Sequence, residues 1–299
     1  MFVRSKLFVP GSRPELFEKA VNSAADAVSF DLEDAVAPDR KDEARASVVS
    51  FLRGRNSASR KIAIVRVNAI STAWFAEDIE AVAGAAPDVI NLPKVESAAD
   101  VRMAVEAITR AEEACGHSNK MRVLANIETP KGLRLAAEIA AADPRVIGLQ
   151  LGLADLFLPL GIDRRDVTAL QFVRIAVRLA AGEARIPAYD AALLDIRNLE
   201  ACREEAESAR RLGFAGKSCL HPSQIAIVNE AFAPRADEVE YAVKVSAAAR
   251  DAAERGVQAF MLDGQLIDAP VIAHARAVAE AAGRYETARP GRVRGFDAN

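Results

Sequence analysis

The sequence predicts an α/β fold, a (β/α)8 TIM barrel with a C-terminal helical extension. Short apolar runs alternate with longer amphipathic segments through residues 1–233. The short runs lack the polar alternation of a half-exposed sheet, which is typical of parallel strands buried on both faces. Eight strand–helix pairs occur in series, the number that closes such a barrel. A doubly wound open sheet is the alternative, but no GxGxxG motif follows any candidate strand.

The expected elements follow one another along the chain in a regular order. Short apolar or β-branched runs predict strands at 5–9, 26–31, 61–67, 88–92, 121–127, 145–151, 185–189 and 214–219. Amphipathic patterns predict helices at about 14–23, 38–53, 73–84, 97–115, 131–142, 165–182, 197–212 and 222–232. Residues 1–233 are therefore the predicted catalytic barrel. Residues 234–299 hold a helix at about 235–255, a loop or short hairpin, and a helix at about 270–283. We expect this extension to pack on a neighbouring subunit.

Composition and charge exclude several classes of protein. The chain has 299 residues, 51% hydrophobic and 27% charged, as in soluble globular proteins. A net charge of -3 argues against a nucleic-acid partner, because such proteins usually carry a basic face. No run of 18 apolar residues and no signal peptide occur, so we expect a cytoplasmic protein without a membrane partner. Three scattered cysteines indicate reduced thiols rather than disulfides.

The polar residues at the expected strand ends are the candidate site, because catalysis in such barrels occurs where the strands end. Asp31, Glu33 and Asp34 follow the second strand in "SFDLEDAV". Three carboxylates within four residues repel one another unless water, a cation or hydrogen-bond donors meet them. The sequence alone does not choose among these three.

Two further carboxylates are separated by one strand–helix unit. Glu128 ends the fifth strand in "NIETPKG", and Asp155 follows the sixth in "LGLADL". We expect them at equivalent heights on neighbouring strands, ~4.8 Å apart. Such a pair can share a hard cation, and oxygen-only ligation suits Mg²⁺, with Mn²⁺ as a substitute. In the alternative, each carboxylate pairs with a nearby lysine, such as Lys131 or Lys94.

Two cationic side chains accompany these acids. Arg66 shares one face of its strand with Ile62 and Ile64, and the pattern leaves open whether that face points inward. Inside the barrel it would stabilise an enolate or thioester oxygen; outside, it would pack on a helix. Lys94 ends the fourth strand and could form a Schiff base. Neighbouring carboxylates favour its ammonium form, so charge balance is the preferred interpretation.

Several motifs, taken in order, resemble one known family. They are "LFVPGSRPELFEKA", "DLEDAVAPDRKDEAR", "VRVNA", "LPKVES", "IETPKG", "LGLADL", "GFAGKSCLHPSQIAIVNEAFAP" and "GQLIDAPV". The chain resembles the citrate lyase β-subunit-like (CitE-like) family, which includes malyl-CoA and citramalyl-CoA lyases of the HpcH/HpaI aldolase superfamily. The resemblance extends from about residue 4 to residue 283.

This resemblance implies a role for each matching residue. Glu128 and Asp155 are implied to bind Mg²⁺, and Glu33 and Asp34 to hold metal-bound waters. Arg66 is implied to lie beside the thioester or oxo acid. The resemblance assigns the acyl-CoA site to Phe8 and Arg13, with Lys19 beside them. Asp268 of "LID" is implied to be the catalytic acid or base, delivered by a neighbouring subunit of a homotrimer or hexamer.

The implied reaction is Mg²⁺-dependent cleavage or formation of a C–C bond in a 3-hydroxyacyl-CoA. Malyl-, citramalyl- or citryl-CoA would give acetyl-CoA and glyoxylate, pyruvate or oxaloacetate. The alternatives are a citrate lyase β subunit acting on a citryl-acyl-carrier protein, a metal-dependent aldolase on free hydroxy-oxo acids, and a malyl-CoA thioesterase. Two departures from the family pattern, Ala154 in "LGLADL" and Tyr189 in "IPAYDAALLD", leave the substrate open. Tyr189 is expected to reshape the acid end of the pocket.

Overall fold

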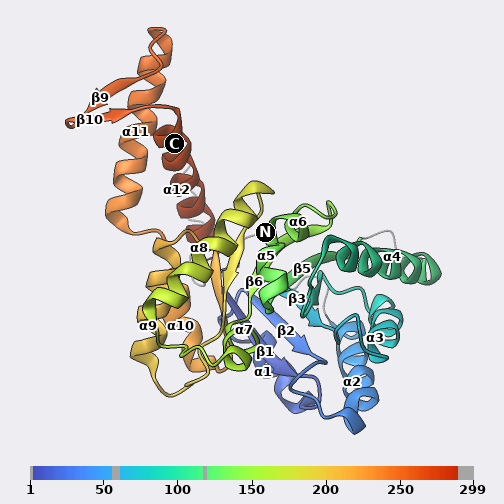
Figure 1. The fold of residues 1–299 in the computed structure, drawn as a ribbon. Coiled ribbons are helices and arrows are strands. Elements are labelled where there is room, and N and C mark those ends of the chain that lie inside the picture. The colour runs from blue at the N-terminus through green and yellow to red at the C-terminus, as the bar shows by residue number, and fades with distance from the viewer. Residues whose placement is uncertain (1–2, 56–60, 117–119, 289–299) are drawn as a thin grey trace, which may run out of the picture. The chain divides into compact units, whose positions relative to one another are not determined.

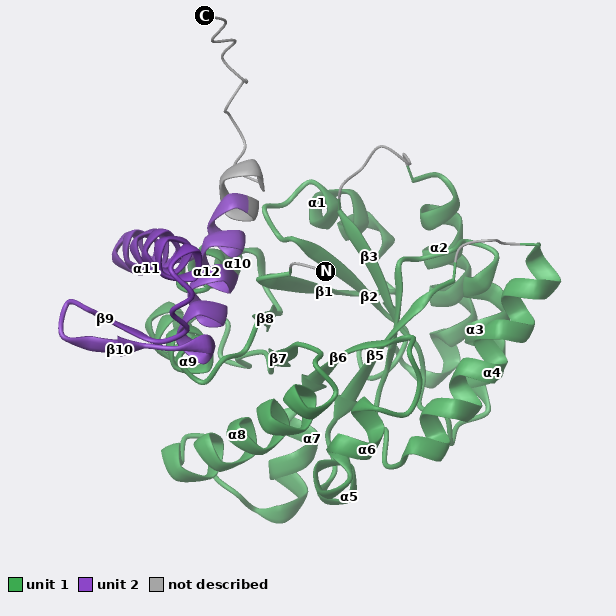
Figure 2. Ribbon diagram, turned by 90° about the horizontal axis from the view of Figure 1, so that it is seen from above, with its two compact units in different colours: residues 1–232 green, residues 233–299 purple. Residues whose placement is uncertain are grey.

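The computed structural model describes residues 3–55, 61–116 and 120–288, and the chain divides into two compact units. Unit 1 is Met1–Phe232 and unit 2 is Ala233–Asn299 (Figure 2). The last eleven residues of the predicted extension, 289–299, lie outside the described residues.

Unit 1 is a closed barrel of eight parallel strands in sequence order, which confirms the predicted fold (Figure 1). The strands are β1 (Ser5–Pro10), β2 (Ala27–Asp31), β3 (Ile62–Arg66), β4 (Val89–Leu92), β5 (Arg122–Ile127), β6 (Val146–Leu151), β7 (Ala188–Asp190) and β8 (Gly216–Cys219). The helices are α1 (Phe17–Val21), α2 (Lys41–Arg53), α3 (Trp74–Ala83), α4 (Ala98–Cys115), α5 (Pro130–Arg134), α6 (Ala136–Ala140), α7 (Leu153–Phe157), α8 (Val167–Glu183), α9 (Leu199–Arg211) and α10 (Pro222–Ala231).

Three regions differ from the expected elements. The seventh strand starts at Ala188 rather than 185, because the preceding residues end α8. The Ile186 N–H donates to the Ala181 carbonyl at 3.0 Å, and Pro187 has no N–H for a strand ladder. The helix expected at 131–142 is divided into α5 and α6, and α7 is an additional short helix after β6.

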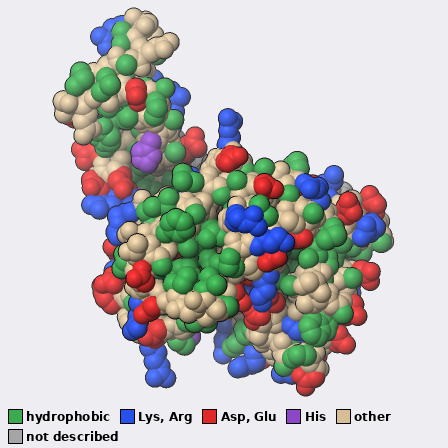
Figure 3. Space-filling model, in the orientation of Figure 1, with side chains coloured by type: hydrophobic (Ala, Val, Ile, Leu, Met, Phe, Trp, Pro, Cys, Tyr) green, Lys and Arg blue, Asp and Glu red, His purple; other side chains and the backbone are tan. Residues whose placement is uncertain are grey.

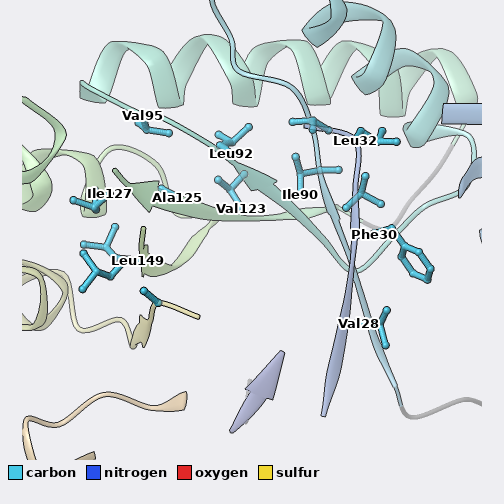
Figure 4. Packing of buried hydrophobic residues seen from close by; sticks show 14 of the residues in the cluster. Val28, Phe30, Leu32, Ile90, Leu92, Val95, Val123, Ala125, Ile127 and Leu149 are labelled. Carbon is cyan, nitrogen blue, oxygen red and sulfur yellow. The ribbon is translucent and has the colours of Figure 1, made fainter. Parts of the chain in front are cut away.

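Alternation along the strands gives the barrel an apolar outside and a largely polar inside. Outward side chains of neighbouring strands form the main core, such as Val28, Phe30, Ile90, Val123 and Leu149 (Figure 4). The inward faces begin with a small apolar layer of Val3, Ala27, Ile64, Val89, Leu124 and Tyr189. Beyond that layer the inward positions are polar and buried: Lys6, Ser29, Asp31, Asn91, Asn126 and Gln150. The interior therefore becomes polar toward the ends of the strands.

Asp190 and Lys217, two of the polar residues at strand ends, do not reach the barrel mouth. Both are fully buried and occupy outward positions, where Lys217 Nζ lies 2.7 Å from Asp190 Oδ2. Arg174 on α8 binds Asp190 in a bidentate pair, and Glu205 on α9 accepts from Lys217 at 2.7 Å. Burial alone would raise the pKa of Asp190, but the charges of Lys217 and Arg174 outweigh it and lower that pKa. This ion network joins strands to helices.

Tyr189 belongs to the lower apolar layer and does not line the pocket as expected. Its hydroxyl is buried and has no hydrogen-bond partner among the described residues. An unpartnered buried hydroxyl costs about 1–3 kcal/mol, so Tyr189→Phe is expected to raise the free energy of unfolding by about 1 kcal/mol. Urea unfolding would measure it, with Tyr241→Phe as control because that exposed hydroxyl has Gln265 as partner.

The same substitution has a pH signature. Burial raises the pKa of Tyr189 from 10.0 to about 12. Between these values the folded protein keeps a proton that the unfolded chain loses, so rising pH lowers the stability of the wild type through Tyr189. The Phe variant should lose this contribution. The difference in unfolding free energy between Tyr189→Phe and the wild type should therefore widen from pH 10 to pH 12. A constant difference would contradict the raised pKa of Tyr189.

Unit 2 consists of two helices and a short hairpin. Its elements are α11 (Ala236–Glu254), β9 (Phe260–Leu262), β10 (Gln265–Ile267) and α12 (Ala269–Ala288). The segment expected as a loop or hairpin is a hairpin, turning at Asp263 and Gly264 with φ of 50° and 78°. Positive φ at both central residues is typical of the type I′ turn. Ala242, Val245, Ile267 and Ala275 form the buried core of this unit.

Among the described residues, none of the helices has the length and hydropathy that a membrane span requires. Figure 3 shows acidic and basic side chains interspersed over the visible face of the molecule.

Candidate active site

A cavity of about 430 Å³ lies at the carboxyl ends of the strands, where the barrel interior is polar. Its charged lining residues are Asp31, Asp34, Arg66, Glu128 and Asp155. Its apolar lining comes mainly from the sixth, seventh and eighth strand ends: Leu151, Leu153, Ala154, Ala191, Ala192, Leu194 and Leu220. One wall is therefore charged and the other is apolar, an arrangement typical of small-molecule sites.

Arg66 points into the barrel, which decides the orientation that its strand pattern left open. Asp31 is its register partner on β2 and binds it in a bidentate pair, with both N–O distances 2.7 Å. Arg66 Nη1 also lies 2.8 Å from Glu33 Oε2. Burial alone would raise the pKa of Asp31, but Arg66 outweighs it and lowers that pKa. Asp31 is thus a fixed carboxylate that holds the arginine.

Lys94 connects the acid cluster of β2 with the acids of β5 and β6. Its Nζ lies 2.7 Å from Glu33, 3.1 Å from Asp34 and 3.5 Å from Asp155. Its backbone N–H donates to Glu128 Oε2 at 3.0 Å, and its φ of 51° is in the left-handed region. Burial alone would lower the pKa of Lys94, but Glu33 and Asp34 raise it. A lysine held as ammonium is a poor Schiff-base nucleophile, which favours charge balance.

Glu128 and Asp155 both face the cavity, but not at equivalent heights. The β5–β6 register pairs Asn126 with Gln150, a shift of 24 residues, so Glu128 stands opposite Gly152. Asp155 lies three residues further on, in the first turn of α7. The prediction that the two carboxylates stand at equivalent heights was wrong, because they are 27 residues apart whereas paired residues of β5 and β6 are 24 apart. The two carboxylates still interact, since the charge of Asp155 contributes to the raised pKa of Glu128.

The chemistry of this wall fits a divalent cation. Five carboxylates (Asp31, Glu33, Asp34, Glu128, Asp155) face three cationic side chains (Lys6, Arg66, Lys94), a formal excess of two negative charges. Burial raises the pKa of Glu33 to about 7 although Arg66 and Lys94 are in contact with it. Burial likewise raises the pKa of Glu128. Both ionised carboxylates are therefore unfavourable in this buried site without a further cation, and an oxygen-only donor set suits Mg²⁺.

Gly152 makes room for the Glu128 carboxylate. A Cβ added at this position would overlap Glu128 Cγ and lie 2.6 Å from Oε1. Gly152→Ala is therefore expected to displace the carboxylate and to weaken Mg²⁺ or Mn²⁺ binding ~10–100-fold, the effect of disturbing a supporting group of a metal site. Calorimetric titration would measure it. Gly54→Ala is the control, because its nearest neighbour is 3.6 Å away; equal affinity in both variants would refute the role of Gly152.

Two supports hold the loops of the mouth. Lys41 on α2 donates to the carbonyls of Leu32 and Glu33, both at 2.6 Å, which fixes the loop after β2. The segment 190–193 begins at the last residue of β7 and includes Ala191 and Ala192 of the apolar wall. Its four consecutive carbonyls each accept from one side chain: Gln150 (2.9 Å), Lys217 (2.6 Å), Arg164 (2.5 Å) and Gln224 (3.2 Å). Both loops are held rigidly by buried side chains.

The structure brings together most, but not all, of the residues proposed for the site. Phe8 lines the cavity, and its ring lies 5.0 Å from the Arg66 guanidinium carbon. Arg13 is exposed and paired with Glu15, and Lys19 is exposed on α1; neither lines this cavity. Asp268 belongs to unit 2, where its Oδ1 accepts from the Val271 N–H at 3.4 Å. The CoA contacts and the acid–base role therefore remain predictions.

Two supporting residues, Asn126 and Lys6, were not predicted from the sequence. Asn126 lies two residues before Glu128 on the same strand face and donates to Glu128 Oε1 at 2.8 Å. Lys6, two residues before Phe8, is a charge inside an otherwise apolar strand. Spacing of two along a strand was the available signal in both cases.

A closed (β/α)8 barrel with carboxylates and a fixed arginine at its mouth defines the class: a barrel enzyme with an acidic, metal-compatible site. Residues 4–222 match the family model HpcH/HpaI aldolase/citrate lyase. The chain belongs to this family, whose members include lyases, and the resemblance drawn from the motifs is confirmed at that level.

Three similar proteins illustrate the range of the family. Citrate lyase subunit beta of Escherichia coli (strain K12) is 40% identical over 92% of this chain and 91% of its own length. L-malyl-CoA/beta-methylmalyl-CoA lyase of Cereibacter sphaeroides is 33% identical over 92% and 93%. CitE from Mycobacterium tuberculosis, solved in complex with magnesium, acetoacetate and coenzyme A, is 38% identical over 94% and 98%, with a TM-score of 0.77.

Proposed function

We propose that this protein is a Mg²⁺-dependent lyase that cleaves, or forms by condensation, the C–C bond of a 3-hydroxyacyl-CoA. The products of cleavage are acetyl-CoA and a 2-oxo acid. The observation that carries the proposal is the Glu128–Asp155 wall, with its surplus negative charge, beside an inward Arg66. The CitE neighbour solved with magnesium, acetoacetate and coenzyme A supports the same assignment.

Glu128 and Asp155 would hold the cation, and Glu33 and Asp34 are proposed to hold its water ligands. A bound divalent cation supplies Lewis acidity, which lowers the pKa of the substrate hydroxyl. Arg66 binds the thioester oxygen as the enolate charge develops, an effect worth ~3–4 kcal/mol for a well-placed donor. Its hydrogen bonds to Asp31 engage two of the five guanidinium donors, and Nη1 lies 2.8 Å from Glu33 Oε2 as an ion pair. The remaining N–H groups would be the donors to an oxygen in the cavity.

The electrons of the broken C–C bond form the enolate of acetyl-CoA, which takes a proton at carbon. The hydroxyl proton leaves to a carboxylate or water of the mouth, and the former hydroxyl carbon becomes the oxo carbon. Asp268 of a neighbouring subunit is the proposed proton donor to the enolate carbon. In condensation it takes the same proton from acetyl-CoA.

The cavity favours a 2-oxo acid with one carboxylate. Arg66 is the single cationic residue among its described lining residues, and Asp31 and Glu33 already neutralise it. A second carboxylate would meet the apolar wall of Ala191, Ala192, Leu194 and Leu220, where a charge without a partner is costly. We therefore infer that malyl- or citramalyl-CoA is preferred to citryl-CoA, with glyoxylate or pyruvate as the oxo acid.

A substrate panel tests this function. The purified protein is incubated with malyl-, citramalyl- or citryl-CoA and with free hydroxy-oxo acids, with Mg²⁺ or with EDTA. Chromatography follows acetyl-CoA, and hydrazone formation follows the oxo acid. Mg²⁺-dependent formation of both products is expected. Free CoA thiol without acetyl-CoA would identify a thioesterase, and turnover of free acids alone would identify an aldolase.

The role of Asp268 predicts complementation between subunits. Asp268→Ala and Glu128→Ala are each expected to be inactive, because one lacks the proton donor and the other a metal ligand. Mixed oligomers refolded from both should regain part of the wild-type activity, since an intact site can form where the two subunits meet. Native mass spectrometry would verify mixing. Absence of activity in confirmed mixed oligomers would contradict a shared site.

A further inference from the structure

A hydrogen-bonded row of side chains crosses the barrel interior and reaches the cavity at Asn126 and Glu128. We call it the interior network; its members are Lys6, Asn91, Asn126 and Glu128. Lys6 Nζ lies 3.3 Å from Asn91 Oδ1, Asn91 Nδ2 lies 2.5 Å from Asn126 Oδ1, and Asn126 Nδ2 lies 2.8 Å from Glu128 Oε1. All four are at most 3% exposed. The network joins β1, β4 and β5 and ends on one proposed metal ligand.

The chemistry of its two ends gives this network a direction. A lysine ammonium has donors and no acceptor, whereas an ionised carboxylate only accepts. Each asparagine between them must accept with Oδ1 on the Lys6 side and donate with Nδ2 on the Glu128 side. The second Nδ2 hydrogen of Asn91 is used by the Leu124 carbonyl at 3.0 Å, which supports the same orientation. Reversing either amide would place two acceptors face to face.

A buried lysine without a carboxylate in contact is costly unless something requires it. Lys6 is 3% exposed and its nearest ring contact is Phe8, 4.5 Å from Nζ to the centroid. Burial lowers the pKa of Lys6 to about 7, and the charge of Arg66 lowers it further. A methionine would fill this space without the charge. The lysine therefore costs stability where it stands.

We propose that Lys6 is a positioning residue that acts through Asn91 and Asn126 to fix the Glu128 carboxylate for metal binding. The network presents an N–H to Oε1, while the Lys94 backbone N–H holds Oε2. Together these two donors hold the carboxylate in one orientation, with its remaining lone pairs toward the cavity. The inference rests on the proposed function, because it takes Glu128 to be a metal ligand.

Lys6→Met separates positioning from simple electrostatics. Removing a positive charge near the site would by Coulomb attraction alone tighten cation binding. Loss of the network instead frees both amides, and disturbed supporting groups typically cost 10–100-fold in metal affinity. The variant is therefore expected to bind Mn²⁺ ~10–100-fold more weakly while its melting temperature rises. A lysine that only fills space would leave the affinity unchanged.

Asn91→Asp tests the direction with a nearly isosteric change. Both oxygens of the new carboxylate accept, so Asn126 must turn its Nδ2 toward position 91 and its Oδ1 toward Glu128. Metal binding is expected to weaken by a similar factor, although the added negative charge would by itself strengthen it. Ser29→Ala is the matched control, because Ser29 is a buried inward residue whose Oγ has no hydrogen-bond partner among the described residues. Its affinity should equal that of the wild type.

The measurement is titration of full-length protein with Mn²⁺ alone, following free Mn²⁺ by electron paramagnetic resonance without substrate. Weaker binding in Lys6→Met and Asn91→Asp, with Ser29→Ala unchanged, supports the inference. Unchanged or tighter Mn²⁺ binding by folded Lys6→Met overturns the inference. If only Asn91→Asp folds, the same result in that variant overturns it. Glu128→Ala is titrated in parallel. If the wild type binds no Mn²⁺, or Glu128→Ala binds it equally well, the proposed function fails instead.

Discussion

Glu128→Gln is expected to lower kcat/KM for cleavage of the preferred CoA ester by about 10³-fold or more. The amide keeps the shape of the side chain but loses the charge, and a catalytic cation contributes several kcal/mol, with ~1.36 kcal/mol per tenfold in rate. The free energy of unfolding of Glu128→Gln should rise or remain unchanged. Glu128 is 3% exposed, and burial raises its pKa, so its ionised form is unfavourable without a cation.

A second buried glutamate supplies the control for this substitution. Glu112 is 4% exposed and pairs with Arg145 at 2.9 Å on the helix side of the barrel wall. Glu112→Gln should lower the free energy of unfolding and leave kcat/KM per folded molecule unchanged. Steady-state kinetics with Mg²⁺, together with urea unfolding of both variants, would separate the two effects. Near-normal turnover by Glu128→Gln would remove Glu128 from the metal site.

The positions of most strands could be predicted from the sequence because each is a short apolar run between two longer amphipathic segments. The start of β7 was misplaced because Arg185 and Ile186, which follow the last residue of α8, donate their N–H groups back to the Gly182 and Ala181 carbonyls of that helix. The residue pattern of 185–189 does not indicate where β7 starts, because the hydrogen bonds that compete with strand pairing are made to carbonyls of the preceding helix.

Side-chain direction was the main limit on predicting the site. Arg66 and Lys217 both stand near strand ends in apolar surroundings, yet one points inward and the other outward. The difference is one position in the alternation, and the inward face is set by the register with neighbouring strands. The same register explains why Gly152, rather than Asp155, stands opposite Glu128. Spacing along the sequence placed the two acids in the same mouth but could not give their relative height.

Arg66→Met is expected to have the largest combined effect on stability and activity. Its removal leaves Asp31 and Glu33 buried without their common partner, which costs about 3–5 kcal/mol in comparable buried pairs. Loss of the oxyanion donor should lower kcat ~10²–10³-fold. Chemical unfolding and single-turnover kinetics would measure the two losses separately.

Adding Asp31→Asn to Arg66→Met separates these roles, because it removes a stranded charge without restoring a donor. Part of the unfolding free energy should return, while kcat stays low; recovery of kcat would show that Arg66 acts only by holding the fold.

The stabilisation that Arg66 gains from Asp31 depends on pH. Arg66 lowers the folded-state pKa of Asp31 from 3.8, so this contribution is present above pH 3.8 and is lost as pH falls through the lower folded value. The stability gap between wild type and Arg66→Met should therefore narrow in acid, and less so when Asp31→Asn is present in both proteins.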